Sequence, residues 1–448
     1  MAKTLTSLGL DLGTTTTQLV ISVLTAENRA PGFAVPRMEI GERKVIYESP
    51  IHFTPLISGE LVDGAALSEL LEAEFRRAGV TADSLDTGAV IVTGETSRKE
   101  NAQTVTRMLA AQAGKFVVAT AGPDLESVLA ARGAGAAAYS KETGKTVIHL
   151  DIGGGTANLA LCREGKVEAA GCFNVGGRLM KFDEDGRLTY VSPVLTGLTD
   201  HRVGEVLSRE QAMTVARMLA QALEEAVGLR EPTGLGEKLR TAGSAKRELP
   251  SGVFSFSGGV ADCIGEERPW LSYGDLGPLL GQAIRESLLC RGEYRLGEQT
   301  IRATVIGAGC HSATLSGSTV CLEGVMLPMK DLPVGCITEE EQENPELWRL
   351  VRQRLEGKEV LFLPGWESPD YEKICHLAEQ LVKGFGDKPC RVALERDMAK
   401  ALGTALMLRL GPNVMCLDGV WIGPDSYLDV GEWVGPAVTV VVKTLAFG

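Results

Sequence analysis

Short apolar runs alternate with amphipathic stretches along the whole chain. The runs GAVIVTGET (88–96) and KTVIHLDIGGGTANLALC (145–162) are rich in β-branched residues and contain glycine turns, which predicts buried strands. The stretches LVDGAALSELLEAEFRRAG (61–79) and SREQAMTVARMLAQALEEAVG (208–228) place apolar residues at helical spacing and therefore predict helices. This alternation of strands and helices is typical of an α/β fold.

The second half of the chain continues the alternation. VFSFSGGVAD (253–262) predicts a strand that ends on two glycines, and ATVIGAGCHSATLSG (303–317) predicts a strand, a glycine turn and the start of a helix. TEEEQENPE (338–346) is acidic, contains proline and is a candidate domain boundary. Beyond it we expect helices near 370–384 and 396–410, separated by short strands.

One strand–turn–strand unit occurs twice. LDLGTTTTQLVI at residues 10–21 aligns with LDIGGGTANLAL at residues 150–161, 140 residues further along the chain. The five identities could arise by chance in apolar strands, but a shared Asp-x-Gly turn between two strands is less easily explained in that way. We interpret the unit as a duplicated β-hairpin, one copy in each of two related domains. The identical positions are Leu10, Asp11, Gly13, Thr16 and Leu19, paired with Leu150, Asp151, Gly153, Thr156 and Leu159.

Both hairpins have the composition of a phosphate-binding turn. Successive backbone N–H groups in a glycine-rich turn form an anion-binding concavity, and short hydroxyl side chains add donors. An aspartate beside phosphates would repel them unless a Mg²⁺ ion lies between, usually through water molecules. Asp11 and Asp151 are therefore candidate metal-side carboxylates. The candidate nucleotide-binding residues of the two turns are Asp11, Gly13, Thr14, Thr15, Gly153, Gly154, Gly155 and Thr156, with Thr16 as a further hydroxyl donor.

The glycine pair of the third element could place an adenosine against the backbone. It follows a strand and comprises Ser257, Gly258 and Gly259. The chain has neither GxxxxGK[ST] nor a GxGxxG that opens a helix after the first strand. A lone DxGT turn is more often an ordinary hairpin, but two matched hairpins followed by the glycine pair and IGAG favour nucleotide binding.

Composition narrows the choice of partner and compartment. The 448 residues suit two or three domains, and the net charge of −13 argues against nucleic acid or an anionic membrane surface as the main partner. The chain contains no run of about 18 apolar residues, so no membrane span is predicted. The ten cysteines are scattered without a CxxC pair, which disfavours disulfides and zinc and favours a cytoplasmic location.

The order of these motifs resembles the superfamily of actin, sugar kinases and heat-shock chaperone ATPases. LDLGTTTT and LDIGGGTAN look like its two phosphate loops and FSGGVAD like its adenosine loop. DLESVLAARGAGAAAY and IGAGCHSATLSG resemble the two helices that connect its domains, where small residues permit close packing. The resemblance implies an α/β actin-like ATPase fold: two related, ribonuclease H-like domains around a nucleotide cleft, with a C-terminal α/β extension.

We expect the domain limits that follow from this fold to divide the chain into four parts. They are a first domain over 1–143, a second over 144–305, a segment returning to the first domain over 306–330, and the extension over 331–448. The extension lacks a recognisable chemical motif, and we expect it to pack on the first domain or to contact a partner.

Within the superfamily the full chain resembles the family of ethanolamine ammonia-lyase reactivating factors. The resemblance rests on VTGETSRKENA (92–102), FNVGGRLM (173–180), ALERDMAKALG (393–403) and the closing YLDVGEWVGPAVTVVVKTLAFG. It implies an ATP- and Mg²⁺-dependent, chaperone-like protein whose partner is ethanolamine ammonia-lyase, with large and small subunits. The factor promotes release of damaged cobalamin, so that intact adenosylcobalamin can enter the lyase. The resemblance also leaves open that the protein associates with an ethanolamine-utilisation microcompartment.

A direct cobalamin site is not expected. TDHRVG (199–204) is close to the Asp-x-His-x-x-Gly signature of base-off cobalamin binding, but Asp200 and His201 are adjacent, so the spacing fails.

Hydrolysis of ATP needs a group that orients the attacking water. Asp151, Glu95 and Glu126 are the candidates, although each glutamate could equally be a solvated turn or cap residue. Two other functions stay open from the residues: a small-molecule kinase, for which Glu95 could act as the base, and an ATP-dependent actin-like scaffold.

Overall fold

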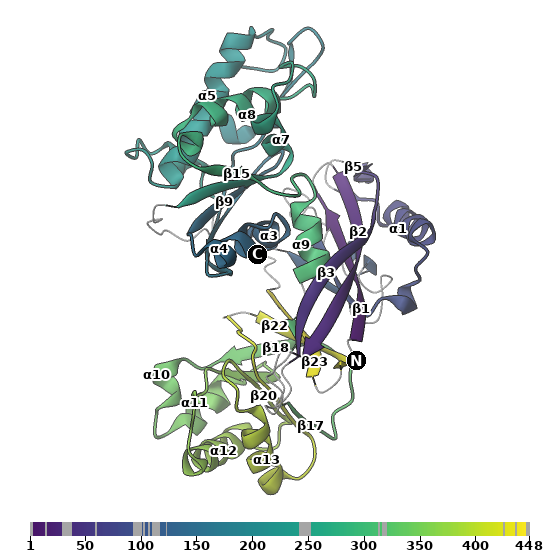
Figure 1. Cartoon of the computed structure of the whole chain (residues 1–448), viewed down its shortest axis with the longest axis vertical. Helices are drawn as coiled ribbons and strands as arrows, with labels where there is room; N and C mark the ends of the chain where they lie inside the picture. The colour runs from purple at the N-terminus through teal and green to yellow at the C-terminus, as the bar shows by residue number, and fades with distance from the viewer. Residues whose placement is uncertain are drawn as a thin grey trace.

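Three large β-sheets organise the described part of the chain, beside two small two-stranded sheets, and a computed structural model shows their arrangement (Figure 1). The first sheet lies between the second sheet and the C-terminal extension in an elongated molecule. The structure describes residues 3–13, 16–28, 38–58, 61–92, 101, 104–105, 108–109, 117–121, 123–241, 252–311, 314–315, 320–423, 426–434 and 437–444.

The first sheet has the strand order β3-β2-β1-β7-β8, and β4 (His52–Phe53) adds to β2. Helix α1 (Gly64–Ala78) covers one face because its apolar stripe of Leu67, Leu71 and Phe75 packs on the leucines of β1. Its first turn is capped by the Asp63 carboxylate, which accepts from the Ala66 N–H at 3.0 Å. The strands are β1 (Lys3–Leu12), β2 (Thr16–Asn28), β3 (Met38–Glu48), β7 (Thr87–Val92) and β8 (Val117–Ala121).

The second sheet repeats this topology. Its order is β11-β10-β9-β14-β15, with the first three strands antiparallel and the last two parallel to β9 and to each other. The first sheet has the same directions at the equivalent positions. The predicted duplication is therefore confirmed at the level of the whole sheet. The strands are β9 (Val147–Ile152), β10 (Ala157–Arg163), β11 (Lys166–Phe173), β14 (Val253–Ser257) and β15 (Tyr294–Leu296).

Helices α5, α7 and α8 cover the face of the second sheet that carries its main apolar core. Capping fixes the start of α5, where Ser208 and Gln211 form a reciprocal capping box. The helices are α5 (Arg209–Ala226), α7 (Gly259–Gly265) and α8 (Gly277–Glu286).

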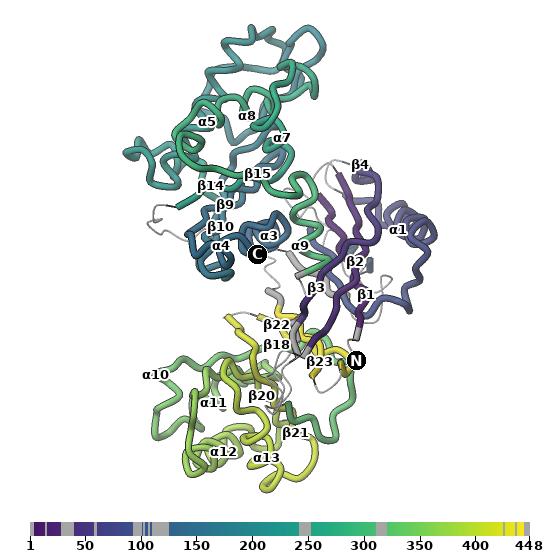
Figure 2. The backbone as a smooth tube through the Cα atoms, in the orientation of Figure 1, coloured from purple at the N-terminus to yellow at the C-terminus, as the bar shows by residue number. Residues whose placement is uncertain are grey.

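Two helices cross between the sheets. Helix α3 (Pro123–Gly133) follows the first sheet but packs on the second together with α4 (Ala136–Thr143), whereas α9 (Ala303–His311) follows the second sheet and packs on the first. Figure 2 shows α3 and α9 side by side between the two sheets.

The strand predicted at the start of 303–317 is wrong, because Ala303–His311 is helical. The β-branched run favoured a strand, but the glycines and alanines of this segment allow a helix to pack closely on α3 and β1. The resemblance to a connecting helix is confirmed for the residues up to His311, whereas Thr314–Leu315 form a strand.

The C-terminal extension, together with Thr314–Leu315 and Cys321–Glu323 that precede it along the chain, forms an eight-stranded sheet within the described residues. Its order is β16-β23-β22-β18-β19-β20-β21-β17, and β18 to β21 run parallel. Helices α11 (Leu347–Arg354), α12 (Tyr371–Phe385) and α13 (Ala399–Leu410) pack on one face. The strands are β16 (Thr314–Leu315), β17 (Cys321–Glu323), β18 (Met329–Cys336), β19 (Val360–Leu363), β20 (Cys390–Leu394), β21 (Val414–Leu417), β22 (Ser426–Val434) and β23 (Ala437–Thr444).

Apolar contacts join this extension to the first domain. Val434 and Ala437 belong to the same buried cluster as Leu5 and Leu24 of the first sheet and Ile306 of α9. The extension therefore packs on the first domain, which was one of the two arrangements expected from the sequence. The exact domain limits given above stay a prediction.

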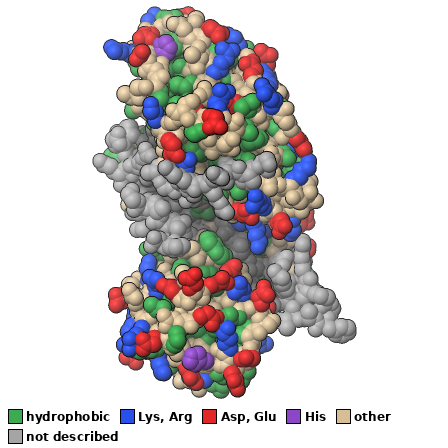
Figure 3. Space-filling model, turned by 90° about the vertical axis from the view of Figure 1, so that its left-hand side faces the viewer, with side chains coloured by type: hydrophobic (Ala, Val, Ile, Leu, Met, Phe, Trp, Pro, Cys, Tyr) green, Lys and Arg blue, Asp and Glu red, His purple; other side chains and the backbone are tan. Residues whose placement is uncertain are grey.

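The acidic segment 338–346 is part of the extension. It begins with the short helix α10 (Glu339–Gln342), whose carboxylates pair with basic side chains of the surrounding elements. Glu339 lies 2.8 Å from Arg396, and Glu341 lies 2.6 Å from Arg354. Acidic and basic side chains are interspersed over the extension and the second domain on the face shown in Figure 3.

Candidate functional site

The turns of the two hairpins close in the same way. In the first, the Gly13 N–H donates to the Thr16 carbonyl at 2.9 Å, and in the second the Gly153 N–H donates to the Thr156 carbonyl at 2.9 Å. Each turn joins two antiparallel strands whose last residues before the glycine are paired across the hairpin. The two sequence motifs therefore form one local structure, which is what a shared ligand-binding role would require.

Three carboxyl groups gather where these hairpins begin. Asp11 and Asp151 each precede the last residue of their central strand, and Glu126 lies in the first turn of α3. Burial raises the pKa of Glu126 well above its usual value, and the negative charges of Asp11 and Asp151 raise this pKa further. Glu126 is thus within electrostatic reach of both aspartates, and the three predicted acidic residues lie together.

Asp151 is buried and held by hydroxyl groups. The Ser257 hydroxyl donates a short hydrogen bond to Asp151 Oδ1, and the Thr304 hydroxyl of α9 donates to Oδ2 at 3.3 Å. Burial raises the pKa of the Asp151 carboxyl, and the two hydroxyl donors act in the opposite direction. A connecting helix therefore contacts the carboxylate of the second hairpin directly.

His149 lies two residues before Asp151, on the same face of β9. Its Nε2 is 3.0 Å from the Ser257 hydroxyl and its Nδ1 is 3.2 Å from the Ser255 hydroxyl. The imidazole is fully buried, and burial lowers its pKa to about 3, so it is neutral at physiological pH.

The glycine pair after β14 is placed as the sequence predicts, at the end of a buried strand and the start of α7. Gly258 has a φ of 84°, and a Cβ there would lie 2.3 Å from the carbonyl oxygen of Ile152, so only glycine fits against the second hairpin. Around Gly259 no atom lies within 4 Å of a built Cβ, so the backbone is accessible. The Ser257 hydroxyl bonds to Asp151 and His149, and its role in binding the nucleotide stays a prediction.

Three candidates cannot be placed. Thr14, Thr15 and Glu95 lie outside the described residues. Of the neighbouring threonines, Thr16 begins β2 and its carbonyl closes the turn, while the buried Thr17 hydroxyl lies 3.1 Å from that of Thr54. The Thr54 hydroxyl in turn donates to the Gly13 carbonyl at 2.8 Å. Thr17 therefore stabilises the turn indirectly, through its contact with Thr54.

Two buried amides were missed by the sequence reasoning. Gln18 is paired across the first hairpin with Asp11, and Asn158 is paired across the second with Asp151. Residues directly opposite in an antiparallel pair share a face, so each amide lies beside its aspartate. Asn158 also hydrogen-bonds Glu126. Each amide follows its aspartate by seven residues, and this spacing could have identified the pair.

Gly176 and Gly177 of FNVGGRLM stabilise the second turn. The sequence alone provides no physical reason for these glycines. The N–H groups of Gly177 and Arg178 donate to the carbonyls of Gly153 and Gly154 at 3.0 and 2.6 Å. A Cβ on Gly176 would lie 2.3 Å from the Gly154 carbonyl oxygen. Glycine is therefore needed here because two backbone segments are in contact.

The site suits a hydrated metal better than a fully protein-bound one. In the part of the chain that the structure describes, no group of three or more His, Cys, Asp or Glu side chains is arranged to bind a metal ion. Mg²⁺, however, is often held by one or two carboxylates with water and substrate phosphates as its other ligands. Asp11 and Asp151 have the chemistry for that arrangement.

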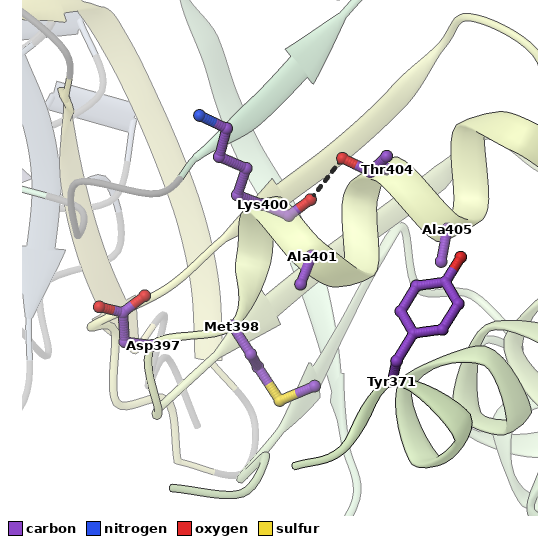
Figure 4. Close-up of a pocket in the computed structure, with 7 residues that line it drawn as sticks. All are labelled: Tyr371, Asp397, Met398, Lys400, Ala401, Thr404 and Ala405. Carbon is purple, nitrogen blue, oxygen red and sulfur yellow. Dashed lines mark hydrogen bonds between the residues drawn. The ribbon is translucent and has the colours of Figure 1, made fainter. Parts of the chain in front are cut away.

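A separate cavity of about 390 Å³ lies in the extension, between the start of α12 and α13. Figure 4 shows the Met398, Ala401 and Ala405 side chains facing the Tyr371 ring, while the Lys400 ammonium group points away. None of the predicted site residues lines this cavity. Its walls lack the converging polar groups that a specific ligand site needs.

Among the described helices, none is both long and apolar enough to cross a membrane. The ten cysteines are free thiols, and seven of them are buried, as the scattered pattern predicts.

Two sheets of the same topology, each opening with an aspartate-bearing hairpin and joined by crossing helices, define an actin-like ATPase fold, which confirms the predicted fold class. The sequence model of the family described as ethanolamine utilisation protein EutA matches residues 3–448. The chain therefore belongs to the EutA family.

Two curated relatives agree with this assignment. The chain is 36% identical over 468 residues to ethanolamine ammonia-lyase reactivase EutA of Salmonella typhimurium (strain LT2), with 99% of each chain covered. It is 36% identical over 465 residues to the protein of the same name from Escherichia coli (strain K12), again with 99% of each chain covered. Among solved structures, ethanolamine utilization protein EutJ from Carboxydothermus hydrogenoformans is similar at 18% identity and a TM-score of 0.35, over 68% of this chain and 89% of that chain.

Proposed function

We propose that this protein binds ATP with Mg²⁺ between its two hairpins and uses it to reactivate ethanolamine ammonia-lyase. The observation that carries the nucleotide part is the convergence of Asp11, Asp151 and Glu126 at two turns with the same closing hydrogen bond. Three carboxyl groups repel one another and a phosphate chain, so a cation is needed for them to serve a nucleotide. The backbone N–H groups of Gly154 and Gly155 would then bind phosphate oxygens, while the Gly13 and Gly153 N–H groups close the two turns and shape them for the ligand.

Mg²⁺ bound beside Asp11 and Asp151 would neutralise charge on the phosphates. Burial and the charges of Asp11 and Asp151 raise the pKa of Glu126, which favours its protonated form relative to an ordinary glutamate, and a carboxyl group at this place could orient a water molecule through a hydrogen bond. The hydrogen bond from Asn158 acts against this shift and lowers the pKa of Glu126. Glu126 is therefore our first choice for the group that positions the hydrolytic water, with Asp151 and Glu95 as the other candidates. Gly258 and Gly259 would accommodate the adenosine.

Reactivation requires that the two nucleotide states differ in their affinity for the lyase. Moving an equilibrium from 1:99 to 99:1 takes about 5.5 kcal/mol of differential binding. ATP would contact both hairpins, and ADP would link them less firmly. The contact between Thr304 and Asp151 and the close packing of α9 on α3 provide a route by which this difference could reorient the two domains. The lyase would then release its damaged cobalamin and bind intact adenosylcobalamin.

The 36% identity to two reactivases over nearly their full length supports this function over the kinase and scaffold alternatives. We further propose that both lyase subunits form the partner surface, that the protein works in the cytoplasm, within or beside an ethanolamine-utilisation compartment, and that it has no cobalamin site of its own. The four-part division at residues 143, 305 and 330 belongs to the same proposal.

The proposal is tested with lyase blocked by cyanocobalamin. The blocked enzyme is incubated with this protein, Mg²⁺, ATP and adenosylcobalamin, and deaminase activity is followed over time. We expect recovery that requires ATP and this protein together. Absence of recovery, combined with phosphorylation of a small acceptor or with ATP-dependent light scattering, would replace the proposal by the kinase or the scaffold.

A further inference from the structure

A line of four polar side chains runs beneath the second hairpin. Strands β9 and β14 are parallel, and their register places Ser255 opposite His149 and Ser257 opposite Asp151. All four side chains are buried and lie on the sheet face opposite to the main apolar core of the second domain. Val147 and Ala160 on the same face are apolar, whereas Asn158, which is paired with Asp151, is polar.

The chemistry of the groups fixes the direction of the hydrogen bonds. An ionised Asp151 carboxylate can only accept, so the Ser257 hydroxyl donates its proton to Oδ1. The Ser257 oxygen must therefore accept from His149 Nε2–H, which lies 3.0 Å away. A neutral imidazole with its proton on Nε2 has an acceptor at Nδ1, and the Ser255 hydroxyl at 3.2 Å supplies the donor. Each of these groups thus has one defined role.

We propose that His149 is a positioning residue for the metal-side carboxylate. By donating to the Ser257 oxygen it turns the Ser257 hydroxyl toward Asp151, and so fixes the carboxylate from the side opposite to the ligand. The Thr304 hydroxyl donates to the second oxygen at 3.3 Å, so each oxygen of the Asp151 carboxylate accepts from one hydroxyl group. This inference rests on the proposed function, because it assigns His149 to the binding of the Mg²⁺–nucleotide complex.

An apolar side chain would serve a purely structural role at this position better. Burying an imidazole requires partners for both nitrogens, and a partly satisfied polar network is costlier than an apolar core. Ser255 and Ser257 supply a hydrogen-bond partner for each imidazole nitrogen. The network ends on the carboxylate that we assign to the metal. Partners behind a metal-side ligand commonly alter metal affinity by 10–100-fold when they are removed.

The test compares three substitutions of His149 that differ in which nitrogen they replace. His149→Gln keeps an N–H near the place of Nε2, His149→Asn keeps a polar group only near Nδ1, and His149→Leu keeps neither. Binding of a fluorescent ATP analogue is measured in EDTA and over a series of Mg²⁺ concentrations, and thermal melting is recorded for each protein. Ser257→Ala removes the donor to Asp151, and Ser140→Ala is the matched control because Ser140 is buried in α4 away from the site.

We expect the Leu and Asn variants to need roughly tenfold more Mg²⁺ for half-saturation, with unchanged binding in EDTA. Ser257→Ala should raise the Mg²⁺ requirement by about the same factor, and only this requirement is compared because Ser257 is also a candidate nucleotide-binding residue. Gln and Ser140→Ala should stay within about twofold of the wild type on the same scale. Equal behaviour of Gln and Leu, or no change in any His149 variant, would overturn the inference. If His149→Leu does not fold, the comparison of Gln, Asn and Ser257→Ala decides. A wild-type protein without Mg²⁺-dependent nucleotide binding would instead overturn the proposed function.

Discussion

The crossing of α3 and α9 can be tested by adding a single methyl group. A Cβ at Gly307 of α9 would lie 2.1, 2.6 and 2.9 Å from the carbonyl oxygen, the carbonyl carbon and the Cα of Leu129 in α3. All three are backbone atoms, which cannot rotate away as the end of a side chain can. Real Cβ atoms essentially never lie closer than 3.0 Å to such atoms, so Gly307→Ala requires the helices to separate by about 1 Å.

A separation of this size should be measurable. Overpacking of a well-packed interior costs about 1–3 kcal/mol, and three close backbone contacts place this site near the upper end. Alanine in place of glycine returns about 1 kcal/mol through its helix propensity. The net loss of about 2 kcal/mol corresponds to a fall of roughly 4–8 °C in the melting temperature of a unit of 150–250 residues. Moving α9 also lengthens the 3.3 Å contact from Thr304 to Asp151 beyond hydrogen-bonding distance, so Mg²⁺-dependent nucleotide affinity should fall as well.

The assay is thermal melting together with nucleotide binding. The matched control is Gly292→Ala, which adds the same methyl group where no atom lies within 4 Å, and should change stability by less than about 0.5 kcal/mol. If Gly307→Ala melts at or above the wild-type temperature, α3 and α9 are not packed as described and the proposed route from Asp151 to the domain interface fails.

Three further predictions, two substitutions and one pH dependence, test other parts of the site. Glu126→Gln should lower ATP hydrolysis by about 10²–10⁴-fold while Mg²⁺–ATP binding is retained, and equal loss of binding would refute its role in orienting water. Gly176→Ala places a Cβ 2.3 Å from the Gly154 carbonyl oxygen and should weaken nucleotide binding about tenfold through distortion of the turn, whereas Gly171→Ala, with its nearest atom at 3.7 Å, should not. The pKa of His149 is lowered from 6.5 to about 3 in the fold, so the unfolded chain binds more protons below pH 6.5 and stability falls as the pH drops through this window. Wild-type protein should therefore lose about 2 kcal/mol through this residue between pH 7 and 5, and a melting series on His149→Gln should show a correspondingly smaller loss.

The parts of the fold that local chemistry determines were predictable from the sequence. The Asp-x-Gly turns predicted two equivalent hairpins because strand, turn and strand lie within a dozen residues. The helices at 208–228 and 370–384 were found within a few residues, since their apolar spacing and caps are local.

Features that depend on contacts between distant segments were not predictable in the same way. The β-branched residues at the start of α9 predict a strand. The sequence does not show that the glycines of this segment allow close packing of a helix on α3. The glycines 176 and 177 had no explanation until their contact with the turn at 153–154 was seen. The hydrogen bonds of Ser257 to His149 and Asp151 were likewise not predictable, because they arise from the pairing of two strands that are about 100 residues apart.

The most direct test of the account measures the release of damaged cofactor itself. Lyase saturated with cyanocobalamin is mixed with this protein and Mg²⁺, and free cyanocobalamin is quantified in the filtrate with ATP, with ADP and without nucleotide. The account predicts ATP-dependent release by the wild type and loss of that release in Asp11→Asn. Release that is independent of ATP, or undiminished in Asp11→Asn, would contradict it.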